Sequence, residues 1–266
     1  DILLATPLVR WIRNRFPAAQ LDFASRDKFR GILEGNPHLN RILYLPEPAS
    51  FGQLKEFCRE RIKPEEYDLV VDIHDNFRSR YLSRISGAEI AEWKPPRLKR
   101  WLLVKFKMRG LLKNYPPVPL RYLQAVQHLG VEDDGGGLEF QISETAEREK
   151  EKLWRESAFN GEKYLVIAPG ARWATKRWQP EKYIETVTAL LKQGAFEEAA
   201  VSGSPAEWQL CEEVATGIGA GAVNFAGKTD FKLAGAIIRS AGFYLGNDSG
   251  LSHIAAEIGR ASCRER

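Results

Sequence analysis

Apolar residues recur along this chain with two alternating periods, one typical of helices and one typical of buried strands. Helical spacing begins with Ile2, Leu4, Leu8 and Val9 and stops at Pro17. Short apolar runs bounded by Gly, Pro or Asn predict strands at residues 19–25, 40–46, 67–74, 163–170, 198–203, 222–227 and 242–247. Because helical patterns separate these runs, the chain predicts βαβ units with parallel sheets, an α/β fold.

A polar, glycine-rich break interrupts the alternation near the middle of the chain. The stretch "VEDDGGG" starts at Val131, and a highly charged helix follows it. Because few contacts cross such segments, we place a domain boundary there, between residues 1–140 and 141–259. Both halves repeat the strand–helix order, which predicts two Rossmann-like domains in tandem.

Both ends of the chain look incomplete. The chain starts at Asp1 inside a predicted element, so we expect the first strand of the domain to be missing. Residues 260–266 resemble translated sequencing-adapter read-through, so we expect them to be a non-native tail.

Composition changes this picture little. Of the 266 residues, 44% are hydrophobic and 28% are charged, and no apolar run approaches the roughly 20 residues that span a bilayer. The three cysteines are scattered and odd in number, which favours a reducing compartment over a disulfide framework. The His, Cys and acidic residues do not cluster with metal-ligand spacing, so we expect no metal.

Loops that follow the strands of the second half are rich in glycine, hydroxyl and cationic residues. In open parallel sheets such loops bind ligands, and helix N-termini there bind phosphate. The candidate residues are Gly170, Lys176, Lys228, Asp248, Ser249, Gly250 and His253. Taken singly, Asp248 can be a helix N-cap, His253 a packed side chain and each lysine a surface residue. The joint pattern favours a ligand that carries a diphosphate.

Three better-known motifs fail in this sequence. "GIGAGA", from Gly217, lacks the G-x-G-x-x-G spacing and precedes a strand, which counts against a nicotinamide-dependent oxidoreductase. "GKT", from Gly227, would need a glycine where Ala222 stands to be a P-loop. "GNDSG", from Gly246, is not the G-x-S-x-G of a hydrolase.

The first half offers a different kind of chemistry. His74, Asp75, Asn76 and Arg78 follow the strand predicted at residues 67–74, at its carboxyl end. A polar strand end of this kind is a second candidate binding edge.

A long basic segment follows. Residues 93–131 contain no Asp or Glu and nine Lys or Arg, interleaved with Trp101, Phe106 and aliphatic side chains. This pattern favours a membrane surface or an anionic amphiphile, with Lys105, Lys107 and Arg109 as contacts, and we expect no nucleic-acid partner. The alternative is a solvated basic face whose apolar residues pack inward.

Four segments together resemble a known family. "DILLATP", "DIHDNFRSR", "PGARWATKRW" and "GNDSGLSH" occur in an order and spacing similar to glycosyltransferase family 9, the ADP-heptose:lipopolysaccharide heptosyltransferases. The resemblance runs from Asp1 to about Gly259. It implies a GT-B architecture, in which two Rossmann-like domains face each other across a cleft, the C-terminal one binding the sugar nucleotide and the N-terminal one the acceptor.

The resemblance also implies roles for individual residues. Asp1 matches the aspartate that acts as general base on the acceptor hydroxyl, and Lys176 matches the lysine that holds the diphosphate. The residues that match the family's nucleotide-binding motif are Asp248, Ser249, Gly250 and His253. The glycine that precedes the aspartate in the family is absent here, as are the family's usual last strand and helices.

The implied activity is transfer of heptose from ADP-heptose to an anionic, lipid-linked acceptor of the lipopolysaccharide inner core, with inversion and without a cofactor. Asn76 and Arg78 would contact the acceptor at the cytoplasmic face of the inner membrane, to which the protein would bind peripherally. Two alternatives stay open: a GT-B transferase with another nucleotide sugar, and a non-catalytic nucleotide-sugar or glycolipid-binding module. Asp1 distinguishes them, because a binding module needs no carboxylate base.

Overall fold

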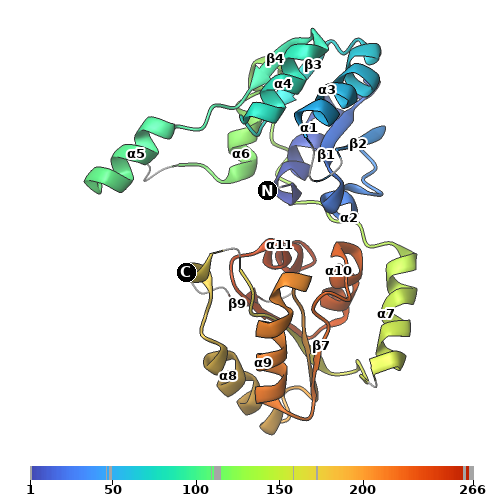
Figure 1. Ribbon diagram of the computed structural model, residues 1–266, viewed down its shortest axis with the longest axis vertical. Helices are drawn as coiled ribbons and strands as arrows, with labels where there is room; N and C mark the ends of the chain where they lie inside the picture. Colours follow the sequence, from blue (N-terminus) through green and yellow to red (C-terminus); the bar gives the residue numbers. More distant parts are fainter. Residues whose placement is uncertain are drawn as a thin grey trace. The chain divides into compact units, whose positions relative to one another are not determined.

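The computed structural model describes residues 2–45, 47, 50–108, 110, 115–157, 159–171, 173–259 and 262–263 (Figure 1). The chain divides into two compact units. The N-terminal unit comprises residues 2–30 and 37–138, and the C-terminal unit comprises residues 31–36 and those from Glu139 onward. Each unit combines helices with parallel strands, so the predicted α/β class is confirmed.

The N-terminal unit holds two parallel sheets of two strands each. β1 (Asp22–Arg26) pairs with β2 (Arg41–Leu45), and β3 (Leu69–Asp72) pairs with β4 (Glu89–Glu92). The α-helices of this unit are α1 (Thr6–Arg15), α3 (Phe51–Phe57), α4 (Phe77–Ser86), α5 (Arg97–Phe106) and α6 (Val118–Leu123). α2 (Arg30–Leu33) begins in this unit and continues into the C-terminal one.

β4 is a strand that the sequence pattern did not predict. It buries Ala91 but leaves Ile90 exposed, so it contains no continuous apolar run. Its backbone pairs in register with β3, where Val70 lies opposite Ile90. Tertiary pairing therefore defines this strand, because side-chain pattern alone is a weak guide for short edge strands.

The C-terminal unit is built on a five-stranded parallel sheet of order β7-β6-β5-β8-β9. The strands are β5 (Tyr164–Ala168), β6 (Glu198–Val201), β7 (Ala222–Asn224), β8 (Phe243–Gly246) and β9 (Ser262–Cys263). The helices are α7 (Glu144–Ser157), α8 (Pro180–Lys192), α9 (Trp208–Ile218), α10 (Phe231–Ser240) and α11 (Gly250–Glu257). β9 lies within residues 260–266, which we expect to be a non-native tail, and it pairs with β8.

β5 is the centre of this sheet and is buried along its whole length. Successive strand residues point to opposite faces, so its two faces pack on different helices. Leu165 and Ile167 belong to the core that includes Tyr183 of α8 and Val214 of α9. On the other face, the Tyr164 hydroxyl donates to the Ile237 carbonyl of α10 at 2.6 Å. Helices on both faces explain why β5 reads as a continuous apolar run.

Residues 31–36 belong to the C-terminal unit because a buried lysine holds them there. The Lys232 ammonium, on α10, donates to the Glu34 carbonyl at 2.6 Å and also to the Gln141 carbonyl. Burial lowers the pKa of Lys232, and the two carbonyl acceptors replace the water it has lost. This short segment of the first half is therefore fastened to α10.

Among the described residues, none of the helices is both long and apolar enough to cross a membrane.

Asp134 fastens α1 to the start of the glycine-rich segment. Its carboxylate accepts hydrogen bonds from Arg10 Nε at 2.6 Å, from Trp11 Nε1 at 2.8 Å and from Asn14 Nδ2 at 3.2 Å. The backbone N–H of Gly136 donates to the same carboxylate at 2.9 Å. The hydrogen bonds from Arg10 hold the pKa of Asp134 well below its usual range.

We predict that Asp134→Asn lowers the free energy of unfolding by about 1–3 kcal/mol at neutral pH, because Arg10 loses a charged acceptor. The folded-state pKa of Asp134 is depressed. Its contribution is therefore complete above the unfolded-state pKa, about 3.9, and is lost as the pH falls below that value. Urea unfolding of both proteins across this range measures the difference. The control is Asp133→Asn, whose carboxylate accepts from the Gly135 N–H; equal losses in both variants would contradict the account.

Candidate functional site

The carboxyl edge of the C-terminal sheet brings three loops together. β5, β6 and β8 are parallel neighbours, so the loops that follow Ala168, Val201 and Gly246 leave the same edge. β6 and β7 lie on one side of β5, and β8 lies on the other. The chain therefore adds β6 and β7 on one side of β5 and then crosses to add β8 on the other side. In an open α/β sheet, ligands bind at such a change of side, so the expected ligand position is the crevice between β5 and β8.

The buried side chain of Asn247 joins the two loops that border this crevice. Its Oδ1 accepts from the Trp178 backbone N–H and from the Tyr183 hydroxyl, both at 3.0 Å. Its Nδ2 donates to the Pro169 carbonyl at 2.7 Å and to the Gly170 carbonyl at 3.4 Å. The loop after β5 is thus held at both of its ends by the first residue after β8.

Lys176, Asp248 and His253 meet at the mouth of the crevice. The Lys176 ammonium lies 2.9 Å from Asp248 Oδ2, and His253 Nε2 lies 4.0 Å from Asp248 Oδ1. The side chain of Lys176 is 47% exposed, so its charge faces solvent as well as Asp248. A pair this exposed contributes little to stability and can exchange partners when an anion arrives.

Ser249 and Gly250 begin the helix that follows. Ser249 is the N-cap of α11, and its backbone N–H donates to Ser252 Oγ at 3.1 Å. A Cβ on Gly250 would lie 3.9 Å from the ring of Phe231, an ordinary van der Waals contact. The start of α11 therefore lies directly after Asp248.

Gly170 has a steric reason to be glycine. A Cβ there would come within 2.1 Å of Glu207 Oε1. Glu207 itself accepts from the Ser204 N–H at 2.8 Å and from the Ser204 hydroxyl at 2.7 Å. Neither Glu207 nor Asn247 was among the predicted site residues, although both stand in loop segments that the sequence marks as polar.

Lys228 lies apart from the other lysine. It follows β7, two strands from β5, and its side chain is exposed. Its loop docks on the loop after β6, because the Gly227 N–H donates to the Gly203 carbonyl at 3.0 Å. The structure thus places Lys228 on the same edge of the sheet, but not in the group around Asp248.

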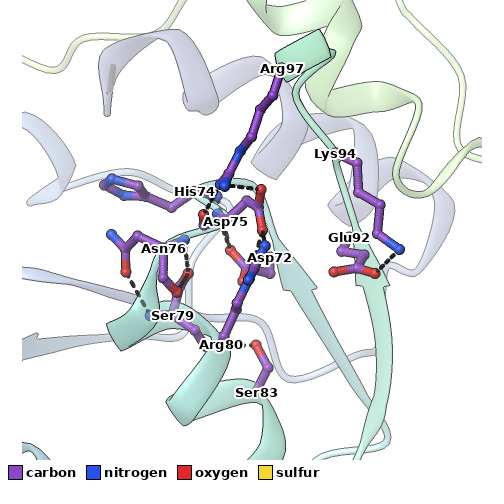
Figure 2. Close-up of polar contacts among 10 residues, drawn as sticks. All are labelled: Asp72, His74, Asp75, Asn76, Ser79, Arg80, Ser83, Glu92, Lys94 and Arg97. Carbon is purple, nitrogen blue, oxygen red and sulfur yellow. Dashed lines mark hydrogen bonds and ion pairs between the residues drawn. The ribbon is translucent and has the colours of Figure 1, made fainter.

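The N-terminal unit has its own polar strand end, which Figure 2 shows. Asp72 Oδ1 accepts from the backbone N–H groups of His74 and Asp75 at 2.9 and 3.0 Å. This turn carries Asp75 into the left-handed region, with φ of 51°. Asn76 then caps α4, accepting from the Ser79 N–H at 2.9 Å.

Two arginines approach Asp75 from opposite sides (Figure 2). Arg80 donates to Oδ1 through Nε at 2.7 Å, and Arg97 donates to Oδ2 through Nη2 at 2.8 Å. Burial raises the pKa of the Asp75 carboxyl, but Arg80 and Arg97 outweigh burial and hold that pKa below its usual range. Asp75 is therefore an ion-paired structural carboxylate.

The remaining predicted residues of this half are scattered. Arg78 is exposed on the first turn of α4. Lys105 and Lys107 lie at the end of α5, where the Lys105 ammonium sits 4.8 Å from the centroid of the Trp101 ring. Asp1 and Arg109 lie outside the described residues.

The structure also bears on a metal site and on a second cavity. Within the part of the chain that the structure describes, no three His, Cys, Asp or Glu side chains are placed to hold a metal ion. A cavity of about 890 Å³ runs along α9, lined by Glu207, Trp208, Glu212 and Glu213 among others. Arg177 also lines this cavity, but three carboxylates outnumber its one guanidinium and make it a poor site for a diphosphate, because like charges repel.

Comparisons with known proteins show the family to which the chain belongs. The profile of glycosyltransferase family 9 (heptosyltransferase) matches residues 57–262. Lipopolysaccharide heptosyltransferase 3 of Escherichia coli K12 is 28% identical, over 97% of this chain and 76% of that protein. Lipooligosaccharide heptosyltransferase 2 of Haemophilus ducreyi is 24% identical, over 98% of this chain and 77% of that protein.

Solved structures show the same fold. The family 9 glycosyltransferase of Veillonella parvula superposes with a TM-score of 0.83 at 17% identity, covering 99% of this chain and 76% of that one. ADP-heptose lps heptosyltransferase II of Escherichia coli gives 0.76 at 20% identity, covering 99% and 80%. The predicted GT-B fold class is thereby confirmed. The chain belongs to glycosyltransferase family 9, the heptosyltransferases.

Proposed function

We propose that this glycosyltransferase transfers heptose from ADP-heptose to an acceptor of the lipopolysaccharide inner core, with inversion. The observation that carries the proposal is the group formed by Lys176, Asp248 and His253 at the point where the sheet changes direction. Its curated relatives are lipopolysaccharide heptosyltransferases, and a solved relative is named for ADP-heptose.

The donor diphosphate would sit between Lys176 and the first turn of α11. A phosphate oxygen would take the place of Asp248 as partner of the Lys176 ammonium, and the N–H groups at the helix start would face the same charge. Charge builds up on the departing nucleoside diphosphate during transfer. A lysine and a helix N-terminus can stabilise that charge without a metal ion.

Glu207 is suited to bind the ribose of the donor. It follows β6, the strand beside β5, and its carboxylate lies against Gly170. In open α/β folds a carboxylate after the neighbouring strand accepts hydrogen bonds from ribose hydroxyls. The missing side chain of Gly170 lets the Glu207 carboxylate lie close to the loop after β5, beside the proposed diphosphate position.

The acceptor would bind to the N-terminal unit, where Asn76, Arg78, Lys105, Lys107 and Arg109 are the candidate contacts. An anionic acceptor suits the basic segment to which three of them belong. Asp1 would take the proton from the attacking hydroxyl. Because the acceptor is lipid-linked, we place the protein at the cytoplasmic face of the inner membrane as a peripheral enzyme.

We predict that Lys176→Ala weakens ADP-heptose binding by about 1.5–3 kcal/mol, because a charge-assisted contact with phosphate is lost. Calorimetric titration measures the change. The control is Lys182→Ala, since Lys182 is an equally exposed lysine that pairs with Glu185 on α8. Equal affinities in both variants would remove Lys176 from the donor site, and tight binding of another nucleotide sugar instead would identify a different donor.

We predict that Glu207→Gln weakens ADP binding about tenfold or more but leaves inorganic diphosphate binding almost unchanged, because the carboxylate would contact only the ribose. Titration of both ligands separates the two contributions. Glu213→Gln, an exposed position on α9, is the control. A parallel loss of ADP and diphosphate affinity would show that Glu207 acts on the phosphate region or on the fold.

We predict that Asp1→Asn lowers the rate of heptose transfer about 10²–10⁴-fold while ADP-heptose affinity stays constant, because a general base acts on the acceptor alone. Transfer is measured by the mass gain of the acceptor. Unchanged turnover would exclude Asp1 as the base, and a wild-type protein that binds donor without any transfer would favour a binding module.

A further inference from the structure

An exposed apolar cluster marks α5 and the two residues that follow it. Leu98, Trp101, Val104, Phe106 and Met108 are all exposed, from 48% at Met108 to 79% at Val104. These five are half of the ten large apolar side chains that are exposed in the described part of the chain. Scattered exposed apolar residues are ordinary, but such a concentration in one short segment marks an interaction surface.

The helical geometry aligns part of this cluster. Leu98, Trp101 and Val104 recur every three residues, so they share one side of α5. α5 extends away from the β3–β4 sheet and the other helices of its own unit (Figure 1). The alternative for this segment was a solvated basic face whose apolar residues pack inward. α5 does not show that arrangement, because these three apolar side chains are exposed to solvent.

Cations are interleaved with the aromatic rings. The Lys105 ammonium lies 4.8 Å from the centroid of the Trp101 ring and 5.6 Å from that of Phe106, and the two rings meet edge to face at 5.6 Å. Lysines with apolar stems beside an indole are typical of the membrane interface, where the ring lies at headgroup depth and the ammonium reaches phosphate.

The charge of the basic segment indicates what kind of partner covers α5. Residues 93–131 carry nine Lys or Arg and no Asp or Glu. A protein groove would require acidic residues spread over the whole segment, whereas the surface of an anionic bilayer attracts every cation near it. We propose that α5 lies in the headgroup region of an anionic lipid bilayer, with Leu98, Trp101 and Val104 against the acyl chains. The inference rests on the proposed function insofar as a lipid-linked acceptor requires such a surface.

Arg97 connects this helix to the polar strand end of its unit. It is the first residue of α5, and its guanidinium donates to the Asp75 carboxylate at 2.8 Å and to the Asp75 carbonyl at 3.0 Å. Asp75 is buried between β3 and α4 and accepts from Arg80 as well. A bilayer-bound α5 would therefore hold the turn with Asn76 and Arg78 close to the lipid surface, where a lipid-linked saccharide is presented.

Sedimentation with vesicles tests the proposal on the full chain. Wild-type protein should bind vesicles of phosphatidylglycerol and phosphatidylcholine, should bind pure phosphatidylcholine weakly, and should lose binding as salt rises. The combined variant Leu98→Ser, Trp101→Ser and Val104→Ser should lose binding. Lys105→Gln and Lys107→Gln should each weaken vesicle binding about fivefold.

The control is Trp208→Ser, which removes a tryptophan of matching exposure in the C-terminal unit and should bind vesicles like wild type.

Trp101 reports insertion directly. The difference in emission between wild type and Trp101→Phe should shift to shorter wavelength on addition of anionic vesicles, because the indole leaves water. This readout also stands if the triple serine variant fails to fold. An unchanged Trp101 emission, or a triple variant that binds as wild type does, would overturn the proposal. So would a wild-type dimer in sedimentation equilibrium that the triple variant loses, since the occupant would then be a second copy.

The assay separates this inference from the proposed function. Release of ADP from ADP-heptose in the presence of acceptor reports transfer, and vesicle sedimentation reports docking. Docking without transfer would leave the role of α5 intact and reject the proposed reaction. Transfer to a lipid-linked acceptor without any vesicle binding would reject the role of α5 alone.

Discussion

The arrangement of the carboxyl edge of the C-terminal sheet depends on one buried side-chain amide. Asn247 is the residue directly after β8, and its side chain holds the backbone at Pro169 and at Trp178, the two ends of the loop after β5. A buried amide must satisfy both its donor and its acceptor, so these bonds hold both ends of the loop in place. Lys176 lies within that loop and Asp248 directly follows Asn247. Their 2.9 Å contact is a consequence of the buried bonds beneath it.

The two strand ends of the molecule use charge in different ways. At the C-terminal edge, Lys176 and Asp248 form an exposed pair that an anion can open at low cost. At the N-terminal edge, the Asp75 carboxylate is buried and is shared by Arg80 and Arg97, so it stays paired even when one arginine is lost. The first arrangement suits a site that must exchange ligands. The second suits an anchor, here for the helix that begins at Arg97.

The sequence predicted those features that come from local pattern. The buried strand at residues 163–170 reads as an apolar run because helices cover both of its faces, and the GNDSG turn reads as a ligand loop because small and polar residues follow a strand. The sequence pattern did not predict β4, because Ala91 is the only buried residue of that strand. The sequence pattern did not identify Asn247 and Glu207, because their contacts are with loop residues that lie 78 and 37 positions away, which periodicity cannot bring together. The basic segment was recognised by its charge, but only the structure shows that its apolar residues face outward along α5.

The central claim is that a nucleoside diphosphate binds at the carboxyl ends of β5 and β8. A crystal structure of the protein with ADP tests it most directly. The account predicts electron density for the diphosphate between the Lys176 ammonium and the first turn of α11, with the Lys176–Asp248 contact opened. Density for the diphosphate of ADP away from the first turn of α11, with Lys176 still paired to Asp248, would contradict it.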